Sequence, residues 1–349
     1  IEEGGSLFQA QFKYKQNMEW EGTLTRTAIS GEGKIDTKDK ANWNAATEMP
    51  NPSDRKIWGA IPGTDYKTDY NNFVETNSIL IDSMFTLTGN SIGDYHKDTA
   101  TVSGVVGNTR CSSKGDSIAT IADGTDDDAK GLISFVRGED YFDYDGDCIL
   151  DEKRQALNAV GGSENIYLGD IYHSELVVVG APSAGTSYTG KNQESYWRSI
   201  NGYETWAQSA NLKNRKRIIY VGANDGMLHA FNSATGKEEW AFVPPFIASS
   251  IPTMVNVNLN RSGVGGSNAI FGVDGSPVVH DMYFKSAYST SKQWHTIMMV
   301  PYGRGGAGFS VLDITDPAAP RHLYSILNDH TLHKVHVMDH NGNLNSYDY

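Results

Sequence analysis

The sequence predicts an all-β fold of the β-propeller type, and three observations lead to this prediction. The first is the stretch Ile218–Trp240, in which turn residues separate three short strands. The second is that similar turn-and-strand units recur at Gly303–Tyr324 and Asn341–Tyr347. The third is that Leu168–Gly180 and Val273–Phe284 share an Asp turn, a Ser and a Val-rich strand. One such blade cannot bury both of its faces, so repeated blades are expected to stack around an axis.

The unit at Ile218–Trp240 shows why each of its parts is assigned as it is. Ile218–Val221 is apolar and β-branched or aromatic, as in a strand that is buried on both faces. Asn224-Asp225-Gly226 is a tight-turn signal, because Asn and Gly adopt positive φ at little cost. The return strand is expected at Met227–Phe231. A second turn at Ser233–Gly236 then leads into a third strand.

The chain before this unit predicts fewer strands. Trp20–Ser30 alternates in part and indicates a strand, and Lys56–Ile61 indicates a shorter one. Ile35–Met49 is expected to be a loop with a short helical turn. Phe73–Leu87 fits a helix or a strand equally well. Residues 91–130 are rich in Gly, Ser, Thr and Asp, which predicts a surface insertion.

The remaining segments follow the same logic. Gly131–Arg137 is a short apolar run and predicts a strand. An Asp-rich loop follows it at Glu139–Asp151. Gly190–Leu212 is expected to be a polar loop between blades, and Pro244–Gly266 a second long connection. Trp294–Val300 predicts another strand.

Size and charge restrict the class of protein. With 349 residues, 39% of them hydrophobic, residues 1–349 are expected to form one propeller domain, because propellers grow by radial repetition. A net charge of −13 argues against nucleic-acid binding and suits a soluble protein or one that binds cations. No apolar run approaches the length of a membrane helix. The chain ends within a strand pattern, which predicts a fragment of a larger protein and an incomplete ring of blades.

The Asp-rich loop has the spacing of a calcium site. Its sequence DYDGDCILD places carboxylates at alternate positions of a tight loop, where they converge on one point. The expected ligands are the side chains of Asp143, Asp145, Asp147 and Asp151 and the carbonyl of Ile149. An EF-hand would have Glu at its twelfth position, whereas this loop has Arg154, so it is EF-hand-like only. The alternative is an exposed acidic turn without a metal.

The chain has two cysteines, Cys111 and Cys148, and no CxxC motif. They form a disulfide if the protein is exported, and the alternative is two independent thiols. Because Cys148 lies inside the Asp-rich loop, a disulfide would join the predicted insertion to the predicted metal site.

Five blocks together resemble a known family. VRGEDYFDYDGD, LGDIYHSELVVVGAP, IIYVGANDGMLHAFNSATGKEEWAFVP, VDGSPVVHD and GRGGAGFSVLDITDP follow in the order found in the C-terminal β-propeller of the PilC/PilY-like type IV pilus biogenesis and tip adhesin proteins. The resemblance implies a modified seven-bladed propeller with long inter-blade insertions, export to the cell surface and a pilus-tip location. It also implies calcium-linked control of pilus extension and retraction, pilin or minor-pilin partners, and attachment to a host or abiotic surface. In the best-known members the calcium loop lies late in the propeller, where this chain has Asn328-Asp329-His330.

Two enzymatic interpretations compete with this one. ATGKEEW resembles the docking repeat of quinoprotein dehydrogenases, which are also propellers, but the adjacent cysteines typical of many of them are missing. A structural role for Trp240 between blades is expected instead. The second interpretation is a hydrolase or metal site built from His173, His229 and His280. These histidines lie at strand positions, where structural histidines with satisfied hydrogen bonds are more common. The sequence therefore predicts a non-enzymatic protein without catalytic residues.

Overall fold

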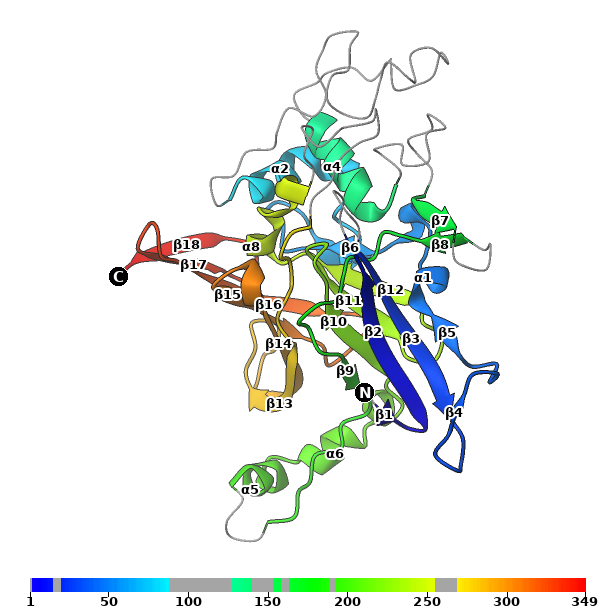
Figure 1. Ribbon diagram of the computed structural model, residues 1–349. Coiled ribbons are helices and arrows are strands. Elements are labelled where there is room, and N and C mark those ends of the chain that lie inside the picture. Colours follow the sequence, from blue (N-terminus) through cyan, green and yellow to red (C-terminus); the bar gives the residue numbers. More distant parts are fainter. Residues whose placement is uncertain are drawn as a thin grey trace.

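We analysed a computed structural model of the chain, which describes residues 2–14, 20–87, 127–139, 153–157, 163–188, 193–254 and 269–349. Three β-sheets of five, five and six strands form the framework of these residues, as the sequence predicts (Figure 1). The sheets lie in chain order and do not close into a ring within the described residues. The fold is thus a modified or incomplete propeller.

The first sheet comes from the N-terminal part of the chain. Its strands are β1 (Glu2–Glu3), β2 (Ser6–Lys13), β3 (Glu21–Ile29), β4 (Ile35–Asp36) and β5 (Trp43–Asn44). The long hairpin β2–β3 forms its centre, and both β4 and β5 pair with β3. The predicted strand at Trp20–Ser30 is therefore confirmed as β3, and the short helical turn expected in Ile35–Met49 is α1 (Ala45–Glu48).

The second sheet contains the unit at Ile218–Trp240. Its strands are β6 (Ile57–Trp58), β9 (Val177–Val179), β10 (Ile218–Gly222), β11 (Leu228–Asn232) and β12 (Glu238–Phe242). Strands β9 to β12 are antiparallel, and β6 adds to β12 in parallel. Gly226, with φ of +90°, closes the predicted turn between β10 and β11. The strands and turns predicted for this unit are confirmed.

The third sheet forms the C-terminal part of the described fold. It contains β13 (Val278–Phe284), β14 (Gln293–Pro301), β15 (Gly308–Asp313), β16 (Arg321–Asp329), β17 (Lys334–Met338) and β18 (Leu344–Asp348), all antiparallel in chain order. Strand β18 is exposed along its whole length, and Figure 1 shows β17 and β18 extending away from the other sheets. A separate two-stranded sheet consists of β7 (Gln155–Leu157) and β8 (Ser163–Asn165).

The second sheet is buried on both faces, as its apolar sequence predicts. Side chains alternate between the two sides of a strand, so Ile219 and Val221 of β10 pack in the core shared with the first sheet. Ile218 and Tyr220 pack in the core shared with the third sheet. Close approach of the second and third sheets requires Gly222, because a Cβ there would lie 2.2 Å from the carbonyl oxygen of Val273.

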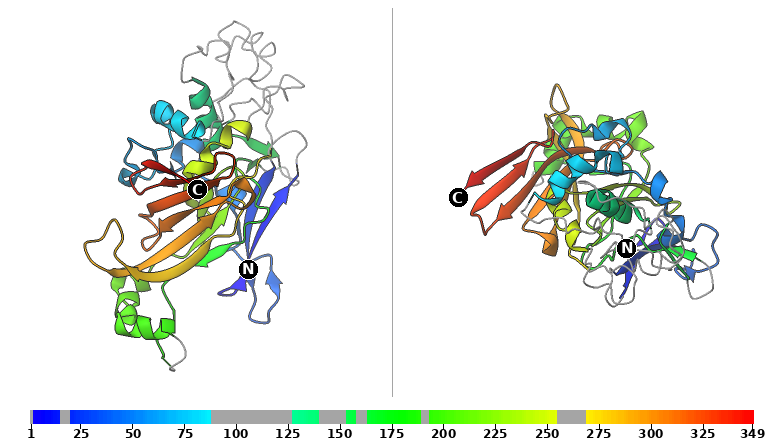
Figure 2. Two further views of the ribbon diagram at one scale, coloured as in Figure 1. Left: turned by 90° about the vertical axis from the view of Figure 1, so that its left-hand side faces the viewer. Right: turned by 90° about the horizontal axis from the view of Figure 1, so that it is seen from above.

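Helices cover two ends of the sheets, and several of them correct the sequence predictions (Figures 1 and 2). Gly131–Arg137 is wrong as a strand, because it is the second half of helix α4 (Asp127–Arg137). Phe73–Leu87 contains the 3-10 turn η3 (Glu75–Asn77) and helix α2 (Ser78–Phe85). An apolar core joins α2 and α4 to α8 (Pro245–Ala248) and η5 (Ile251–Met254) within the predicted long connection.

The predicted polar loop at Gly190–Leu212 is also wrong in its described part. Residues 193–213 fold into α5 (Gln193–Ile200), α6 (Tyr203–Ala207) and α7 (Ala210–Lys213). Tyr203 and Ala207 of α6 are buried against Trp294 of β14, and this apolar contact explains why a polar sequence is helical here. The remaining short 3-10 turns are η1 (Pro52–Asp54), η2 (Tyr66–Thr68) and η7 (Gly303–Gly305). Of the predicted insertion at 91–130, only residues 127–130 are described, as the start of α4.

Candidate functional site

The residues of the predicted metal site and disulfide lie outside the described residues. They are Asp143, Asp145, Asp147, Ile149, Asp151, Cys111 and Cys148. Both remain predictions. Within the described part of the chain, no group of three His, Cys, Asp or Glu side chains is placed to hold a metal ion.

The Asp-rich loop is flanked by described residues, and those on its two sides are held together. Glu139 and Lys153 form an antiparallel bridge, and the backbone N–H of Arg154 donates to the carbonyl of Gly138 at 2.9 Å. Gly138 has φ of +110°, and a Cβ there would lie 2.4 Å from the ring of Tyr167. Only glycine therefore fits at the start of this stem. The residues that precede and follow the loop are therefore held next to each other.

Guanidinium groups surround the C-terminal end of α4, immediately before the loop. The last carbonyls of a helix lack intrahelical partners and carry a partial negative charge. Arg55 donates through Nη1 to the carbonyls of Val136 at 3.1 Å and Arg137 at 2.9 Å, and Arg154 donates to the carbonyl of Phe135. Arg55 and Arg154 are buried, so these bonds are shielded from water.

Arg55 also links the helix end to a buried charge network in the second sheet. Its Nε and Nη2 donate to the carboxylate of Glu238 at 2.7 and 2.9 Å. Glu238 Oε1 lies 2.7 Å from Nδ1 of His229, whose Nε2 lies 3.0 Å from Asp225 Oδ2. Asp225 Oδ2 in turn accepts from the backbone N–H of Gly169 at 2.8 Å. Two cations and two carboxylates thus neutralise each other inside the fold.

The network fixes the protonation of its members. Burial alone would lower the pKa of His229, but Asp225 and Glu238 outweigh it and raise that pKa to about 9. Burial alone would raise the pKa of Glu238, but Arg55 and His229 outweigh it and lower that pKa to about 2. At neutral pH the imidazolium and the carboxylate are therefore both charged. Because neither group is accessible to solvent, we assign the network a role in stabilising the fold.

A second polar cluster joins the turns of successive sheets. Asn224 donates through Nδ2 to Asp170 at 2.7 Å and accepts from the backbone N–H of Gly272 at 3.0 Å. His173 Nδ1 lies 2.7 Å from Asp274 Oδ2. Burial raises the pKa of Asp170 to about 6. The cluster ties the turn of the second sheet to the Asp turns that precede β9 and β13.

The three histidines noted in the sequence are not brought together. His229 belongs to the buried network, His173 pairs with Asp274, and His280 lies 3.4 Å from Glu194 at the surface. Each faces a different carboxylate, as expected for structural histidines. The signal for the network was present in the sequence, because a His and a Glu interrupt apolar strands of one hairpin.

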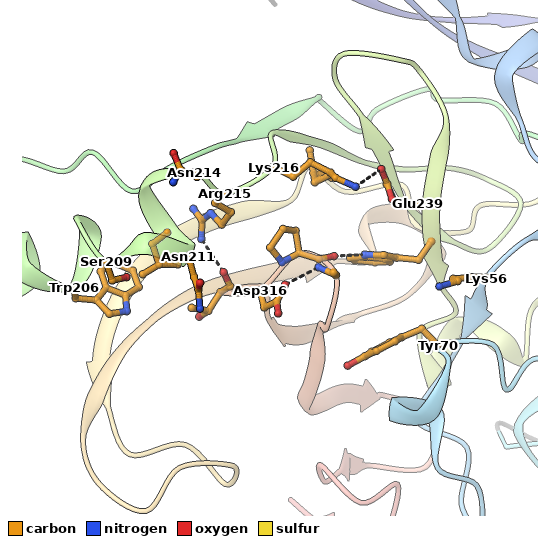
Figure 3. Close-up of a pocket in the computed structure, with 16 residues that line it drawn as sticks. Lys56, Tyr70, Trp206, Ser209, Asn211, Asn214, Arg215, Lys216, Glu239 and Asp316 are labelled. Atoms are coloured by element: carbon orange, nitrogen blue, oxygen red, sulfur yellow. Dashed lines mark hydrogen bonds and ion pairs between the residues drawn. The ribbon is translucent and has the colours of Figure 1, made fainter.

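A cleft of about 670 Å³ opens between the second and third sheets, and the sequence analysis missed it (Figure 3). Its floor is Trp240, only 2% exposed, whose Nε1 donates to the carbonyl of Pro317 at 2.8 Å. This contact confirms the expected packing role of Trp240 between blades. Among the described residues, the lining is Lys56, Tyr70, Trp206, Ser209, Asn211, Leu212, Asn214, Arg215, Lys216, Ile218, Glu239, Trp240, Thr315, Asp316, Pro317 and Ala318.

Comparison with known protein families decides what this fold is. The family model described as the PilY1 beta-propeller domain matches residues 168–342, which is half of the chain and includes strands β9 to β17. The chain belongs to the PilY1 β-propeller family. The matched range contains His229, Glu238 and Trp240, whereas Arg55 of the buried network precedes it.

Individual proteins named PilY1 or PilY1 homolog are also similar to this chain, one of them over most of its length. The type IV pilus biogenesis factor PilY1 of Pseudomonas aeruginosa PAO1 is 28% identical over 323 residues, 91% of this chain and 22% of the relative. PilY1 of strain UCBPP-PA14 is 34% identical over 54% of this chain and 14% of the relative. A PilY1 homolog of Xylella fastidiosa is 37% identical over 45% of this chain and 11% of the relative. The chain thus spans about a fifth or less of these relatives.

A solved structure, that of the P. aeruginosa PilY1 C-terminal domain, also matches. It is 24% identical with a TM-score of 0.29, over 49% of this chain and 37% of that chain. The family and the relatives named above are pilus proteins, which gives no support to the quinoprotein alternative. No helix in the described part of the chain is long and apolar enough to cross a membrane.

Proposed function

We propose that this chain is the β-propeller portion of a type IV pilus biogenesis protein that acts at the cell surface. The observation that carries the proposal is the match of the PilY1 propeller family over residues 168–342. Relatives named as type IV pilus biogenesis factors support it. In this role the chain is a non-enzymatic, exported protein at the pilus tip. It contacts pilin or minor-pilin subunits, supports pilus assembly, extension and retraction, and attaches to a host or abiotic surface.

Calcium binding is part of the proposal. The ligands are the four Asp side chains of DYDGDCILD and the carbonyl of Ile149. The stem of this loop supports the proposal, because the Glu139–Lys153 bridge already brings the loop ends together. A closed loop loses less conformational entropy when its ligands converge on an ion. In an exported protein the Cys111–Cys148 disulfide would restrict the same loop further.

Calorimetry of the purified 349-residue chain tests the metal site. An extracellular site of this kind binds calcium at about 10⁻⁴–10⁻³ M, and a hundredfold excess over Kd stabilises the fold by about 2.7 kcal/mol. The double variant Asp145→Asn with Asp147→Asn should lose both the heat of binding and the shift in melting temperature. Asp348→Asn, on the exposed strand β18, is the control that keeps both. An unchanged titration of the double variant would refute this ligand set.

The pilus role is tested in the native bacterium with the full-length protein. Deletion of the gene should reduce surface pili and surface attachment, and the wild-type gene should restore both. The double Asp variant should restore protein level but not normal pilus extension and retraction. Normal pili and attachment in the deletion strain would contradict the proposed function.

A further inference from the structure

The cleft above Trp240 is pre-formed. Arg215 holds one wall by donating through Nε to the carbonyl of Gly180 at 2.8 Å and through Nη1 to Thr296 Oγ1 at 2.8 Å. The bond from Trp240 to Pro317 holds the floor. Lys216 and Glu239 pair at 2.9 Å on the rim. A volume of about 670 Å³ lies within the range of about 300–1,000 Å³ found for small-molecule sites.

One end of the cleft offers two hydrogen-bond donors. Figure 3 shows Lys56 and Tyr70 side by side, with the ammonium and the hydroxyl pointing into the opening. Neither group has a hydrogen-bond or ion-pair partner among the residues that the structure describes. Burial raises the pKa of Tyr70 to about 12, so its hydroxyl stays protonated and can donate at neutral pH.

The charge of the lining favours an anion at this end. Among the described residues that line the cleft, three are basic and two acidic, a net charge of +1 in a chain of net charge −13. Glu239 is paired with Lys216, and Asp316 accepts from the backbone N–H of Ala318 at 2.9 Å. The ammonium of Lys56 therefore remains available for a carboxylate, and charge-assisted bonds of this kind are the strong ones.

The other end of the cleft carries polar and aromatic side chains. Trp206, Ser209 and Asn211 come from α6, α7 and the turn between them, and their side chains face Asp316 across the opening (Figure 3). The amide of Asn211 and the hydroxyl of Ser209 offer hydrogen-bond donors and acceptors, and the half-buried indole of Trp206 offers an apolar face. Together these groups suit a sugar ring, which carries several hydroxyl groups.

An extended acidic peptide fits this cleft less well. Peptides in extended form gain affinity by pairing with a free strand edge. The two strands that line the cleft have none to offer, because β10 is paired with β9 and β11, and β12 with β11 and β6. Recognition must therefore come from side chains, as it does for a saccharide.

We propose that this cleft binds an acidic oligosaccharide, with Lys56 and Tyr70 holding a sugar carboxylate and Asn211, Ser209 and Trp206 contacting the hydroxyls and ring of a neighbouring unit. The ligand class is that of uronate-containing surface polysaccharides. The inference names a ligand for the attachment proposed above and rests on it for its biological meaning. The described residues that line the cleft lie outside the proposed calcium loop.

Calorimetry with the purified 349-residue chain tests the inference directly. The probes are trigalacturonate and trimannuronate, compared with neutral maltotriose and with hexaglutamate. At least one uronate should bind, at least about tenfold more tightly than maltotriose and hexaglutamate. Lys56→Met should weaken that binding by about tenfold or more, the effect of losing a charge-assisted hydrogen bond. Asn211→Ala should weaken it severalfold.

The matched control is Lys213→Met, which removes an exposed lysine of α7 that does not line the cleft. It should leave uronate binding unchanged, and melting curves should show that all variants are folded. The inference is overturned if neither uronate binds, if maltotriose or hexaglutamate binds as tightly, or if Lys213→Met has the effect of Lys56→Met. Because the assay uses purified protein, failure here leaves the pilus phenotypes of the deletion strain as a separate test of the proposed function.

Discussion

Replacing Glu238 by Gln is the most direct test of the buried network. The change keeps the size of the side chain but removes the charge that balances Arg55 and His229, both of which are fully buried. Removing one partner of a buried ion pair costs about 3–5 kcal/mol, because the other charge stays buried without compensation. Here the loss affects two cations and leaves only Asp225 to balance them. We therefore expect a cost near the upper end of that range.

The loss can be measured as a change in melting temperature. At about 2.1 cal/mol/K per residue, unfolding of 349 residues has an entropy of about 0.7 kcal/mol/K, so a loss of about 5 kcal/mol lowers the melting temperature by about 7 °C. Glu239→Gln is the matched control on the same strand, because Glu239 pairs with Lys216 at the surface, where such pairs contribute about 0–1 kcal/mol. Equal melting temperatures of the two variants would refute the role assigned to the network.

Three further predictions concern the buried network, Gly138 at the loop stem, and the two cysteines. The network should stabilise the fold fully between pH of about 4.5 and 6.5 and less as pH falls toward 2, where Glu238 takes up a proton, or rises toward 9, where His229 loses one. The melting temperature of the His229→Gln variant should therefore fall less than that of the wild type between pH 6.5 and 9. Gly138→Ala should destabilise the fold by roughly 1–3 kcal/mol in urea unfolding because of its positive φ, whereas Gly185→Ala, where nothing lies within 4 Å, should not. Alkylation of the unreduced protein should label neither Cys111 nor Cys148, and labelling of both would exclude the disulfide.

The blade at Ile218–Trp240 could be predicted from sequence because its signals are local. A continuous apolar run and an Asn-Asp-Gly turn indicate a strand and its hairpin neighbour, and the structure pairs them accordingly. Gly131–Arg137 was assigned wrongly because a run of seven residues with four apolar side chains fits a strand or a helix equally well. Its helical form depends on burial of Leu132 and Phe135 against α2 and α8, a contact between distant segments.

The same distinction between local and long-range signals applies to the candidate sites. The calcium ligands could be proposed because they lie within nine consecutive residues, so their spacing is visible in the sequence. The cleft could not be predicted, because Lys56, Asn211 and Asp316 are more than 100 residues apart in the chain and meet only when the second and third sheets pack. Their individual identities carry no signal, since an exposed Lys, Asn or Asp is ordinary on a protein surface.

The described stem changes how the proposed calcium loop relates to the rest of the fold. On sequence alone the loop would be a peripheral turn outside the blade strands. In the structure, however, the residue that precedes its stem is Arg137, whose carbonyl accepts from Arg55, and Arg55 donates directly to Glu238 of β12. Arg137 itself donates to the carbonyls of Phe73 and Arg55. An ion that orders the loop would therefore act on a stem joined by buried charge-assisted bonds to the central strands of the family domain, where displacement cannot be relieved by water. If the loop binds calcium as proposed, this connection links the ion to the packing of the blades, so removal of the ion should loosen β12 as well as the loop.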